Sequence, residues 1–302
     1  MSLCIAVTGG TGLIGPAVCK RLAGQGARVL VITRNLSRAR PRLPDGVEAI
    51  PWPEGPEDEE TLRGIDAIVN LAGEPIAQRW TPAVKARLRE SRVGALDRLF
   101  GLVERSTSRP AVLVSASAIG YYGARGDEPL TEETGPGSGF LANLCVSWEE
   151  AARRFEGLGL RTALVRIGVV LAKEGGALGR MLPLFRLGVG GPVGSGRQWM
   201  SWIHHDDLAD LVAFALRDGR VAGALNGTAP EPVTNAAFAA AMGHVLRRPA
   251  VVPAPGAALR VVLGEMATIV LDGQKVLPKR AQELGFPFRY PSLKGALRQI
   301  LA

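Results

Sequence analysis

The segment Cys4-Ile5-Ala6-Val7-Thr8-Gly9-Gly10-Thr11-Gly12-Leu13-Ile14-Gly15 decides the fold of this chain. Its first half is a short apolar run with β-branched residues, which is typical of a buried strand. Glycines then interrupt the run, and Val18 and Leu22 continue with the spacing of an amphipathic helix. A strand, a glycine turn and a helix in this order predict the phosphate-binding turn of a dinucleotide-binding fold.

The glycines of this turn suit a phosphate ligand for two physical reasons. A glycine adopts positive φ without strain, and its missing Cβ lets a pyrophosphate approach the backbone. The free N–H groups at the start of the following helix attract the same anion. A glycine-rich turn of another kind of α/β protein is the alternative. The residues of this segment expected to contact a cofactor are Gly9, Thr11, Gly12, Leu13, Ile14 and Gly15.

The composition limits the classes of function. The chain has 302 residues, 47% hydrophobic and 21% charged, which suits a globular protein with one large domain or two unequal ones. No apolar run approaches the roughly 20 residues of a membrane span. The three cysteines lack metal-ligand spacing, which indicates reduced thiols, a cytoplasmic location and no metal site. The net charge of +8 comes from scattered basic residues, so we expect neither a nucleic-acid nor a membrane partner.

The end of the second predicted strand, Arg28–Thr33, indicates which dinucleotide is bound. Folds that prefer NAD place Asp or Glu here to accept a hydrogen bond from the ribose 2′-OH. In this chain Arg34 follows the strand, and no carboxylate occurs before Asp45. Arg34 is placed to bind a 2′-phosphate, with Ser37 and Arg38 as helpers, although a surface arginine at a strand end is the alternative. The sequence therefore predicts NADP(H).

Further apolar segments alternate with helical patterns, which predicts a parallel, doubly wound sheet. The expected strands are residues 46–50, 65–73, 111–114 and 161–166. A long helix is expected from Pro82 to about Ser106. Because ligands bind at the carboxyl edge of such a sheet, more cofactor contacts are expected there. They are Leu71, Ala72, Gly73, Ser115 and Arg166.

Several motifs carry a resemblance to a known family. Residues 8–15 (TGGTGLIG), 70–73 (NLAG) and 115–123 (SASAIGYYG) together resemble an extended short-chain dehydrogenase/reductase. Residues 140–149 (FLANLCVSWE), 190–199 (GGPVGSGRQW) and 202–204 (WIH) are similar to its atypical, epimerase-like branch. The resemblance covers nearly the whole chain. It implies a Rossmann domain with a smaller C-terminal α/β cap, and an activity related to NAD-dependent epimerases/dehydratases and sugar nucleotide epimerases.

The resemblance also implies a catalytic site that this chain only partly matches. In the superfamily a Ser or Thr holds the substrate oxygen, and a Tyr-x-x-x-Lys pair transfers the proton and holds the ribose. The lysine lowers the tyrosine pKa by placing a cation beside the phenolate. Ser117 fits the first role. With Glu149 aligned to the family pattern, Leu141 stands at the tyrosine position and Cys145 at the lysine position, so the usual pair is absent.

Three substitutes for the pair remain open. Tyr122, and after it Tyr121, is the expected proton donor, although packing of both rings over the nicotinamide or the substrate is the alternative. A phenol near its reference pKa of about 10 is a weak base at neutral pH without an adjacent lysine. Lys85 or Arg92 on the long helix is a second source of positive charge. The third reading is a protein that binds NADP(H) without turning over a substrate.

Basic and histidine residues in the second half are candidate substrate contacts. Arg180 and Arg197 beside a glycine-rich loop, together with His204, are expected to meet the substrate, with solvated arginines as the alternative. The run His-His-Asp-Asp at 204–207 is similar to a metal cluster. Neighbours on an extended segment point to opposite faces, so no metal is predicted there. One of the two aspartates is instead expected to cap a helix over 208–217.

The chain is expected to divide into two domains. Residues 1–170 and 198–226 form the cofactor domain, and residues 171–197 and 227–302 form the cap, with helices at 235–246, 257–263 and 292–301. The expected function is an NADP(H)-dependent oxidoreductase or epimerase, a monomer or homodimer, acting on a carbonyl, hydroxyl or sugar-nucleotide substrate. The alternative is a non-catalytic NADP(H)-binding protein that senses redox state or binds a partner.

Overall fold

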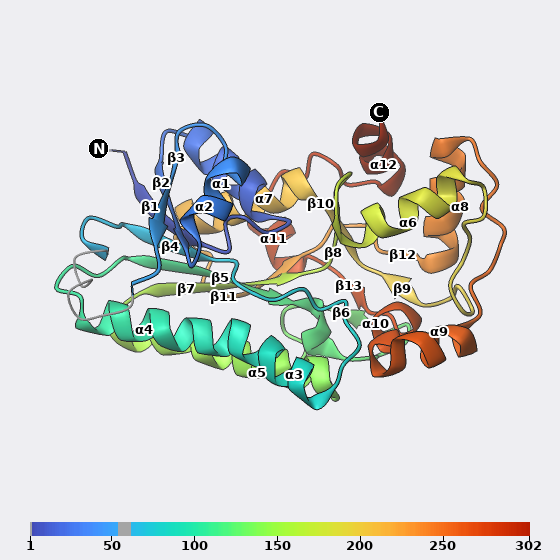
Figure 1. The fold of residues 1–302 in the computed structure, drawn as a ribbon, viewed down its shortest axis with the longest axis horizontal. Helices are drawn as coiled ribbons and strands as arrows, with labels where there is room; N and C mark the ends of the chain where they lie inside the picture. Colours follow the sequence, from blue (N-terminus) through green and yellow to red (C-terminus); the bar gives the residue numbers. More distant parts are fainter. Residues whose placement is uncertain (1, 54–61) are drawn as a thin grey trace.

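The computed structural model describes residues 2–53 and 62–302, which contain a seven-stranded parallel sheet (Figure 1). The strand order is β11-β7-β5-β4-β1-β2-β3, and each neighbouring pair is parallel. The chain runs outward from β1 to β3 on one side and from β4 to β11 on the other, so the predicted doubly wound sheet is confirmed. The strands are β1 (Cys4–Thr8), β2 (Arg28–Thr33), β3 (Val47–Pro51), β4 (Ala67–Asn70), β5 (Val112–Ala118), β7 (Arg161–Ile167) and β11 (Gly223–Gly227).

Helices cover both faces of the sheet, because its strands are apolar on both sides. Ile5 and Val7 of β1 pack in one core, whereas Ala6 between them packs in the core on the opposite face. In Figure 1, α1 and α7 lie over the first face, and α4 and α5 lie over the second. These helices are α1 (Gly15–Gly24), α4 (Ala95–Arg105), α5 (Phe140–Arg153) and α7 (His205–Arg217).

The prediction of one continuous helix from 82 to 106 is wrong, because the helix is interrupted in the middle. It consists of α3 (Pro82–Arg89), a π-helical segment (Glu90–Gly94) and then α4. At the interruption, the side chains of Ser91 and Arg92 both donate hydrogen bonds to the carbonyl of Leu88. Single π-turns inside α-helices occur frequently at functional sites, and a periodic apolar pattern does not reveal them.

A smaller core lies beside the carboxyl edge of the sheet. There α6 (Gly176–Arg186), α8 (Asn235–Leu246) and α12 (Leu293–Leu301) pack around buried side chains such as Trp202 and Phe238. The helices predicted at 235–246, 257–263 and 292–301 are confirmed to within one residue. The remaining α-helices and strands of the described residues are α2 (Leu36–Ala39), β6 (Pro129–Leu130), β8 (Val169–Leu171), β9 (Trp199–Met200), β10 (Trp202–His204), β12 (Val233–Thr234), α9 (Gly256–Leu263), α10 (Thr268–Leu271), β13 (Lys275–Val276) and α11 (Lys279–Glu283).

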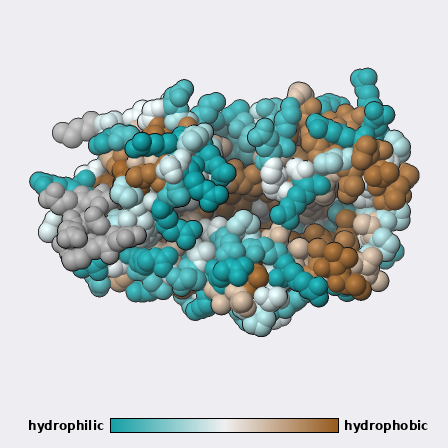
Figure 2. Space-filling model, viewed as in Figure 1, coloured by the Kyte–Doolittle hydropathy of each residue, from teal (hydrophilic) through white to brown (hydrophobic). Residues whose placement is uncertain are grey.

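The surface is uneven in polarity. Figure 2 shows hydrophobic residues gathered at the end of the molecule formed by α6, α8 and α9, whereas much of the remaining visible face is hydrophilic. Large exposed apolar side chains near these helices are Leu184, Leu187, Val189, Val251, Val252, Val261 and Val262. Within residues 2–53 and 62–302, no helix combines the length and the apolar character needed to cross a membrane.

Candidate functional site

The turn between β1 and α1 is built so that only glycine fits at key positions. Gly9 has a φ of +70°, and a Cβ on it would lie 2.5 Å from the carbonyl carbon of Leu71. A Cβ on Gly15 would lie 2.3 Å from the backbone of Gly10. Gly12 is different, because its Cβ would meet only the carbonyl oxygen of Gly9 at 3.3 Å. Gly9 and Gly15 are therefore needed for the conformation of the turn. The absence of a side chain at Gly12 leaves the backbone of the turn accessible to a ligand.

A cleft of about 1400 Å³ opens where β1, β2 and β4 end. Its volume exceeds the roughly 300–1,000 Å³ of an ordinary small-molecule pocket, which suits an elongated ligand such as a dinucleotide. The residues predicted to contact a cofactor that line this cleft are Gly9, Thr11, Gly12, Arg34, Leu71, Ala72 and Gly73. The opposite wall comes from the long helix, which contributes Arg87, Glu90, Ser91, Ala95, Asp97, Arg98, Gly101, Leu102 and Arg105.

Ile14 and Leu13, two further predicted cofactor contacts of the turn, are held by contacts within the protein. Ile14 is the N-cap of α1, and its carbonyl accepts the N–H of Val18 at 3.1 Å. Leu13 is 43% exposed and reaches the start of α6, where a Cβ on Gly176 would lie 2.9 Å from its Cδ2 atom. Leu13 therefore joins the glycine turn to the segment that leaves the sheet.

The end of β2 presents a basic surface to the cleft. Arg34 is exposed and lines the cleft together with Thr33. Asn35 caps α2, since its Oδ1 accepts hydrogen bonds from the N–H of Arg38 and the hydroxyl of Ser37. This arrangement places the N-terminus of a short helix beside Arg34, in a segment without a carboxylate.

Ser115 lies behind the cleft. Its hydroxyl accepts a hydrogen bond from Asn70 Nδ2 at 3.0 Å, and Asn70 Oδ1 accepts one from the hydroxyl of Thr8 at 2.6 Å. All three side chains are at most 1% exposed. They form a polar ladder across β1, β4 and β5 that supports the strand ends.

A buried polar network follows at the end of β5 and β7. Arg166 donates to both carboxylate oxygens of Glu149, and Glu149 Oε1 also accepts the hydroxyl of Ser117 at 2.8 Å. The Tyr122 hydroxyl accepts from Arg166 at 3.0 Å and donates to Asn226 Oδ1 at 2.7 Å. All five residues are at most 3% exposed, so each polar group depends on its partners.

The two tyrosines named as proton donors occupy different environments. Tyr122 is fully buried, and burial raises the pKa of its hydroxyl to about 12 against the opposing effect of Arg166. Tyr121 is partly exposed, and the Arg166 guanidinium lies 3.5 Å from the centre of its ring. Both hydrogen-bonding functions of the Tyr122 hydroxyl are therefore in use, whereas Tyr121 faces a second cleft.

This second cleft, of about 450 Å³, lies beside the edge strand β11. Tyr121 and Arg166 line it together with charged side chains of the segment 132–135 and of α11. Glu132 accepts the N–H groups of Asn226 and Arg280, and burial raises the pKa of its carboxyl group. Arg166, predicted as a cofactor contact, thus lines this cleft and not the larger one.

The positions of the missing tyrosine and lysine lie on α5. Leu141 packs in a hydrophobic cluster with Trp80 and Met266. Cys145 is buried, and burial raises the pKa of its thiol to about 12, so it is neutral at physiological pH. Lys85 lies beside the start of α5, with its ammonium 4.9 Å from the ring centre of Phe140, and it forms an ion pair of 2.5 Å with Glu265.

The three candidate substrate residues of the second half of the chain are placed as follows. Arg180 is exposed and donates to the carbonyl of Ala77 at 3.4 Å, which links α6 to the loop before α3. Arg197 is exposed at the end of the glycine-rich loop. His204 is fully buried and lines neither of the two clefts, so this geometry does not support a substrate contact.

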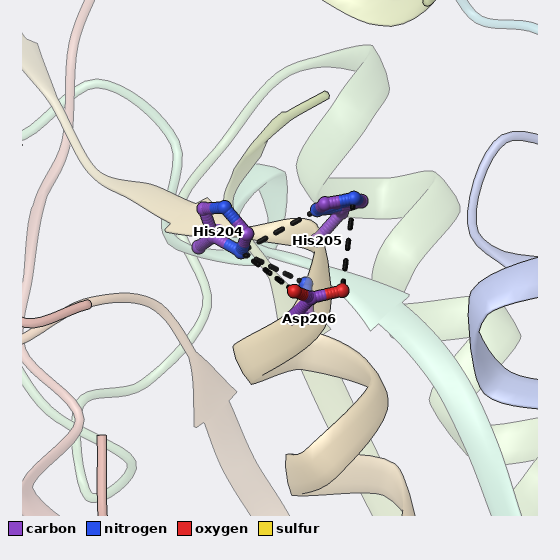
Figure 3. Close-up of side chains that lie close together, drawn as sticks. All are labelled: His204, His205 and Asp206. Atoms are coloured by element: carbon purple, nitrogen blue, oxygen red, sulfur yellow. Dashed lines mark hydrogen bonds and ion pairs between the residues drawn. The ribbon is translucent and has the colours of Figure 1, made fainter. Parts of the chain in front are cut away.

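His204 instead caps α7, which corrects the prediction that Asp206 or Asp207 does so. Its Nδ1 accepts the N–H of Asp206 at 3.0 Å, as Figure 3 shows, and its Nε2 donates to Gln299 at 2.8 Å. The Asp207 carboxylate accepts the N–H groups of Arg289 and Tyr290. His204 can cap the helix because β10 ends at this residue and α7 begins at the next one.

The same turn corrects a second expectation. His204, His205 and Asp206 do not point to opposite faces, since their candidate ligand atoms lie within 4.8 Å of one another (Figure 3). However, both ring nitrogens of His204 already take part in hydrogen bonds. Its lone pair is therefore engaged by the backbone of α7, and the cluster acts here as a helix cap.

Comparison with known proteins agrees with this architecture. Residues 5–226 match the model of the NAD dependent epimerase/dehydratase family, and residues 254–300 match a domain of unknown function, DUF1731. The chloroplastic SDR39U1 homologue of Arabidopsis thaliana, an epimerase family protein, is 44% identical over 98% of this chain and 86% of its own length. The epimerase family protein YfhF of Bacillus subtilis is 37% identical over 99% of this chain and 98% of its own.

A solved structure is similar over the full length. The human epimerase family protein SDR39U1, isoform 2, crystallised with NADPH, is 37% identical, has a TM-score of 0.89 and matches 99% of both chains. This chain belongs to the NAD dependent epimerase/dehydratase family. The family predicted from the motifs is thereby confirmed.

The sequence did not indicate the role of every polar residue at this edge of the sheet. Asn226 lies in a segment that resembles the family, but no sequence pattern indicated a role for it or for Glu132, because their hydrogen-bond partners are far away in the chain. Glu149 did carry a signal, since it lies eight residues after Leu141 and so on the same face of α5 as Cys145. Its pairing with Arg166 required the register of β7 beside β5.

Proposed function

We propose that this chain binds NADP(H) in the large cleft at the ends of β1, β2 and β4. The observation that carries the proposal is the end of β2, where Arg34 lines the cleft and no carboxylate is present to accept a ribose hydroxyl. The bare backbone at Gly12 and the start of α1 suit the pyrophosphate. The NADPH bound to the human relative supports the same choice of dinucleotide.

We further propose that the protein is an oxidoreductase or epimerase of the atypical short-chain class. When bound, the nicotinamide supplies hydride transfer on a carbonyl, hydroxyl or sugar-nucleotide substrate. Residues 171–197 and 227–302 would form the cap over that substrate, with Arg180 and Arg197 as its basic contacts. We propose that the protein is a cytoplasmic monomer or homodimer.

For the proton step, this chain offers Ser117 and two tyrosines. The Ser117 hydroxyl donates to Glu149, is 2% exposed and lines neither cleft, so a substrate hydroxyl would have to reach past the cleft wall to donate to its free lone pairs. Tyr122 is the proton donor that the sequence favours, and it would have to exchange its bond to Asn226 for the substrate. Tyr121 has the more open position over Arg166.

A non-catalytic NADP(H)-binding protein is the second candidate. One observation favours it: the two positions that carry tyrosine and lysine in the family hold Leu141, packed in an apolar cluster, and the neutral thiol of Cys145. A sensor needs only a surface whose conformation changes when NADP(H) binds, and it does not need a proton donor.

Two measurements test these proposals. Titration with NADPH and NADH by fluorescence and calorimetry should give a lower Kd for NADPH, and equal affinities would refute the choice of cofactor. Carbonyl compounds and nucleotide sugars should then be screened for NADPH oxidation or for epimerisation. Turnover of any of them supports the enzyme, whereas tight NADPH binding without turnover across the panel supports the sensor.

A further inference from the structure

The family places a cation on α5, and this chain has none at that position. Cys145 stands where the lysine belongs, is 3% exposed, and has a thiol whose pKa burial raises to about 12. The lysine of the family serves by its positive charge, and a buried neutral thiol cannot replace it. Any compensating charge has to come from another element.

Arg92 brings a guanidinium to this place from the long helix. Its Nη2 donates to the carbonyl of Glu74 at 2.9 Å and its Nη1 to that of Leu88 at 3.1 Å. The guanidinium lies 5.1 Å from the ring centre of Trp148, three residues after Cys145 on α5. Burial lowers the pKa of Arg92, and the nearby Cys145 opposes this, but an arginine stays protonated at neutral pH.

The π-helical segment that carries Arg92 contacts the turn after β4 through two side chains. Ser91 and Arg92 together hold the turn after β4, because the Ser91 hydroxyl accepts the N–H of Glu74 at 3.0 Å while Arg92 binds its carbonyl. Gly73 lies against the guanidinium, where a Cβ would be 3.2 Å from Arg92 Cζ. Gly73, Glu74 and Ser91 line the large cleft. The guanidinium of Arg92 packs against these lining residues from the side away from the cleft.

We propose that Arg92 supplies a fixed positive charge near the position of the missing lysine, and that this charge makes the cleft prefer the reduced cofactor. This inference rests on the proposed binding of NADP(H). The reduced nicotinamide ring is neutral and the oxidised ring carries a positive charge. A buried cation in the wall repels only the oxidised ring, and low-dielectric surroundings strengthen that repulsion.

The test compares the Kd values of NADP⁺ and NADPH for the wild type, Arg92→Gln and Arg92→Lys. Glutamine retains a donor for the Glu74 carbonyl but loses the charge, whereas lysine retains the charge. Both nucleotides share everything except the state of the ring, so the ratio of their Kd values cancels any loosening of the turn. We expect Arg92→Gln to lower the ratio of NADP⁺ to NADPH Kd by roughly three- to tenfold, and Arg92→Lys to keep it within about twofold of the wild type.

Arg89→Met is the matched control, since Arg89 is an exposed arginine of the same helix that bonds Ser147 of α5. It should leave both Kd values unchanged, and thermal unfolding without nucleotide checks that each variant is folded. An unchanged ratio in Arg92→Gln, or an equal fall in Arg92→Lys, overturns this inference while NADP(H) binding stands. Failure of the wild type to bind either nucleotide overturns the proposed function and the inference together.

Discussion

Arg166 donates from Nε and Nη2 to the two carboxylate oxygens of Glu149, at 2.7 and 2.9 Å, and both side chains are 3% exposed. The pair ties β7 to α5 beneath the carboxyl edge of the sheet. Burial lowers the pKa of Arg166, but its hydrogen bonds and attraction to Glu149 outweigh this, and the net shift is upward. The other polar groups at this edge are arranged around the pair.

Removing one partner of this pair should destabilise the fold more than removing both. Glu149→Leu leaves the Arg166 charge buried without a counter-ion, and we expect it to lower the free energy of unfolding by roughly 3–5 kcal/mol. The double variant Glu149→Leu/Arg166→Met should lose less than Glu149→Leu alone. Urea unfolding of the two single variants and the double variant measures this, and simple additivity of the losses would contradict it.

Arg34→Ala should weaken NADPH binding without affecting NADH. A hydrogen bond to a charged group contributes about 1.5–3 kcal/mol, so the Kd for NADPH should rise by roughly 10- to 100-fold. Calorimetric titration provides the values. Arg40→Ala is the control, because Arg40 is an exposed arginine six residues away that does not line the cleft. A loss of the same size for NADH would show that Arg34 does not recognise the 2′-phosphate.

Two glycines of the turn should respond differently to substitution. Gly12→Val should leave the protein folded, since a Cβ there meets only one carbonyl oxygen at 3.3 Å, but its side chain should nearly abolish NADPH binding. Gly15→Ala should reduce stability itself, because its Cβ would lie 2.3 Å from the backbone of Gly10. Melting temperature and NADPH affinity separate the two effects. Wild-type NADPH affinity in a folded Gly12→Val variant would mean that the cleft is misassigned.

Acid should destabilise the protein through His204. Burial lowers its pKa to about 4, below the usual value near 6.5, so the unfolded chain binds this proton first as the pH falls. The stabilising contribution is therefore present above pH 6.5 and is lost on descending towards pH 4, by about 3 kcal/mol in total. His204→Asn retains an N-cap acceptor without titrating, so its free energy of unfolding should fall less over this range. Parallel pH curves for the two proteins would argue against the assignment.

Tyr122→Phe tests the proton donor and the buried network together. The change removes the donor to Asn226 Oδ1, and we expect a loss of about 1–3 kcal/mol in the free energy of unfolding. On an identified substrate, turnover should fall by roughly 10²–10⁴-fold if this phenol transfers the proton, with NADPH affinity little changed. Tyr121→Phe is the matched comparison. Unaffected turnover in both variants and in Ser117→Ala would leave the proton step to water or to another group.

The sequence by itself determined the parts of this protein that depend on local interactions. The strand Arg28–Thr33 and the helix Asn235–Leu246 have the predicted bounds, because their apolar spacing and flanking residues are local signals. The glycine turn and the missing carboxylate after β2 are likewise contained in a few consecutive residues. The alternation of such local patterns predicted the doubly wound fold, and the glycine turn predicted the position of the cleft. The resemblance of longer motifs, such as residues 115–123, indicated the family.

Only the tertiary structure decided which polar groups meet. Tyr122 and Asn226 are 104 residues apart in the chain, and Ser117 and Glu149 are 32 apart, so strand order and helix packing bring them together. The π-turn that carries Arg92 breaks a helix whose apolar pattern looks continuous. Such contacts arise because a buried polar group must find a partner wherever the fold offers one, and sequence spacing does not record that choice.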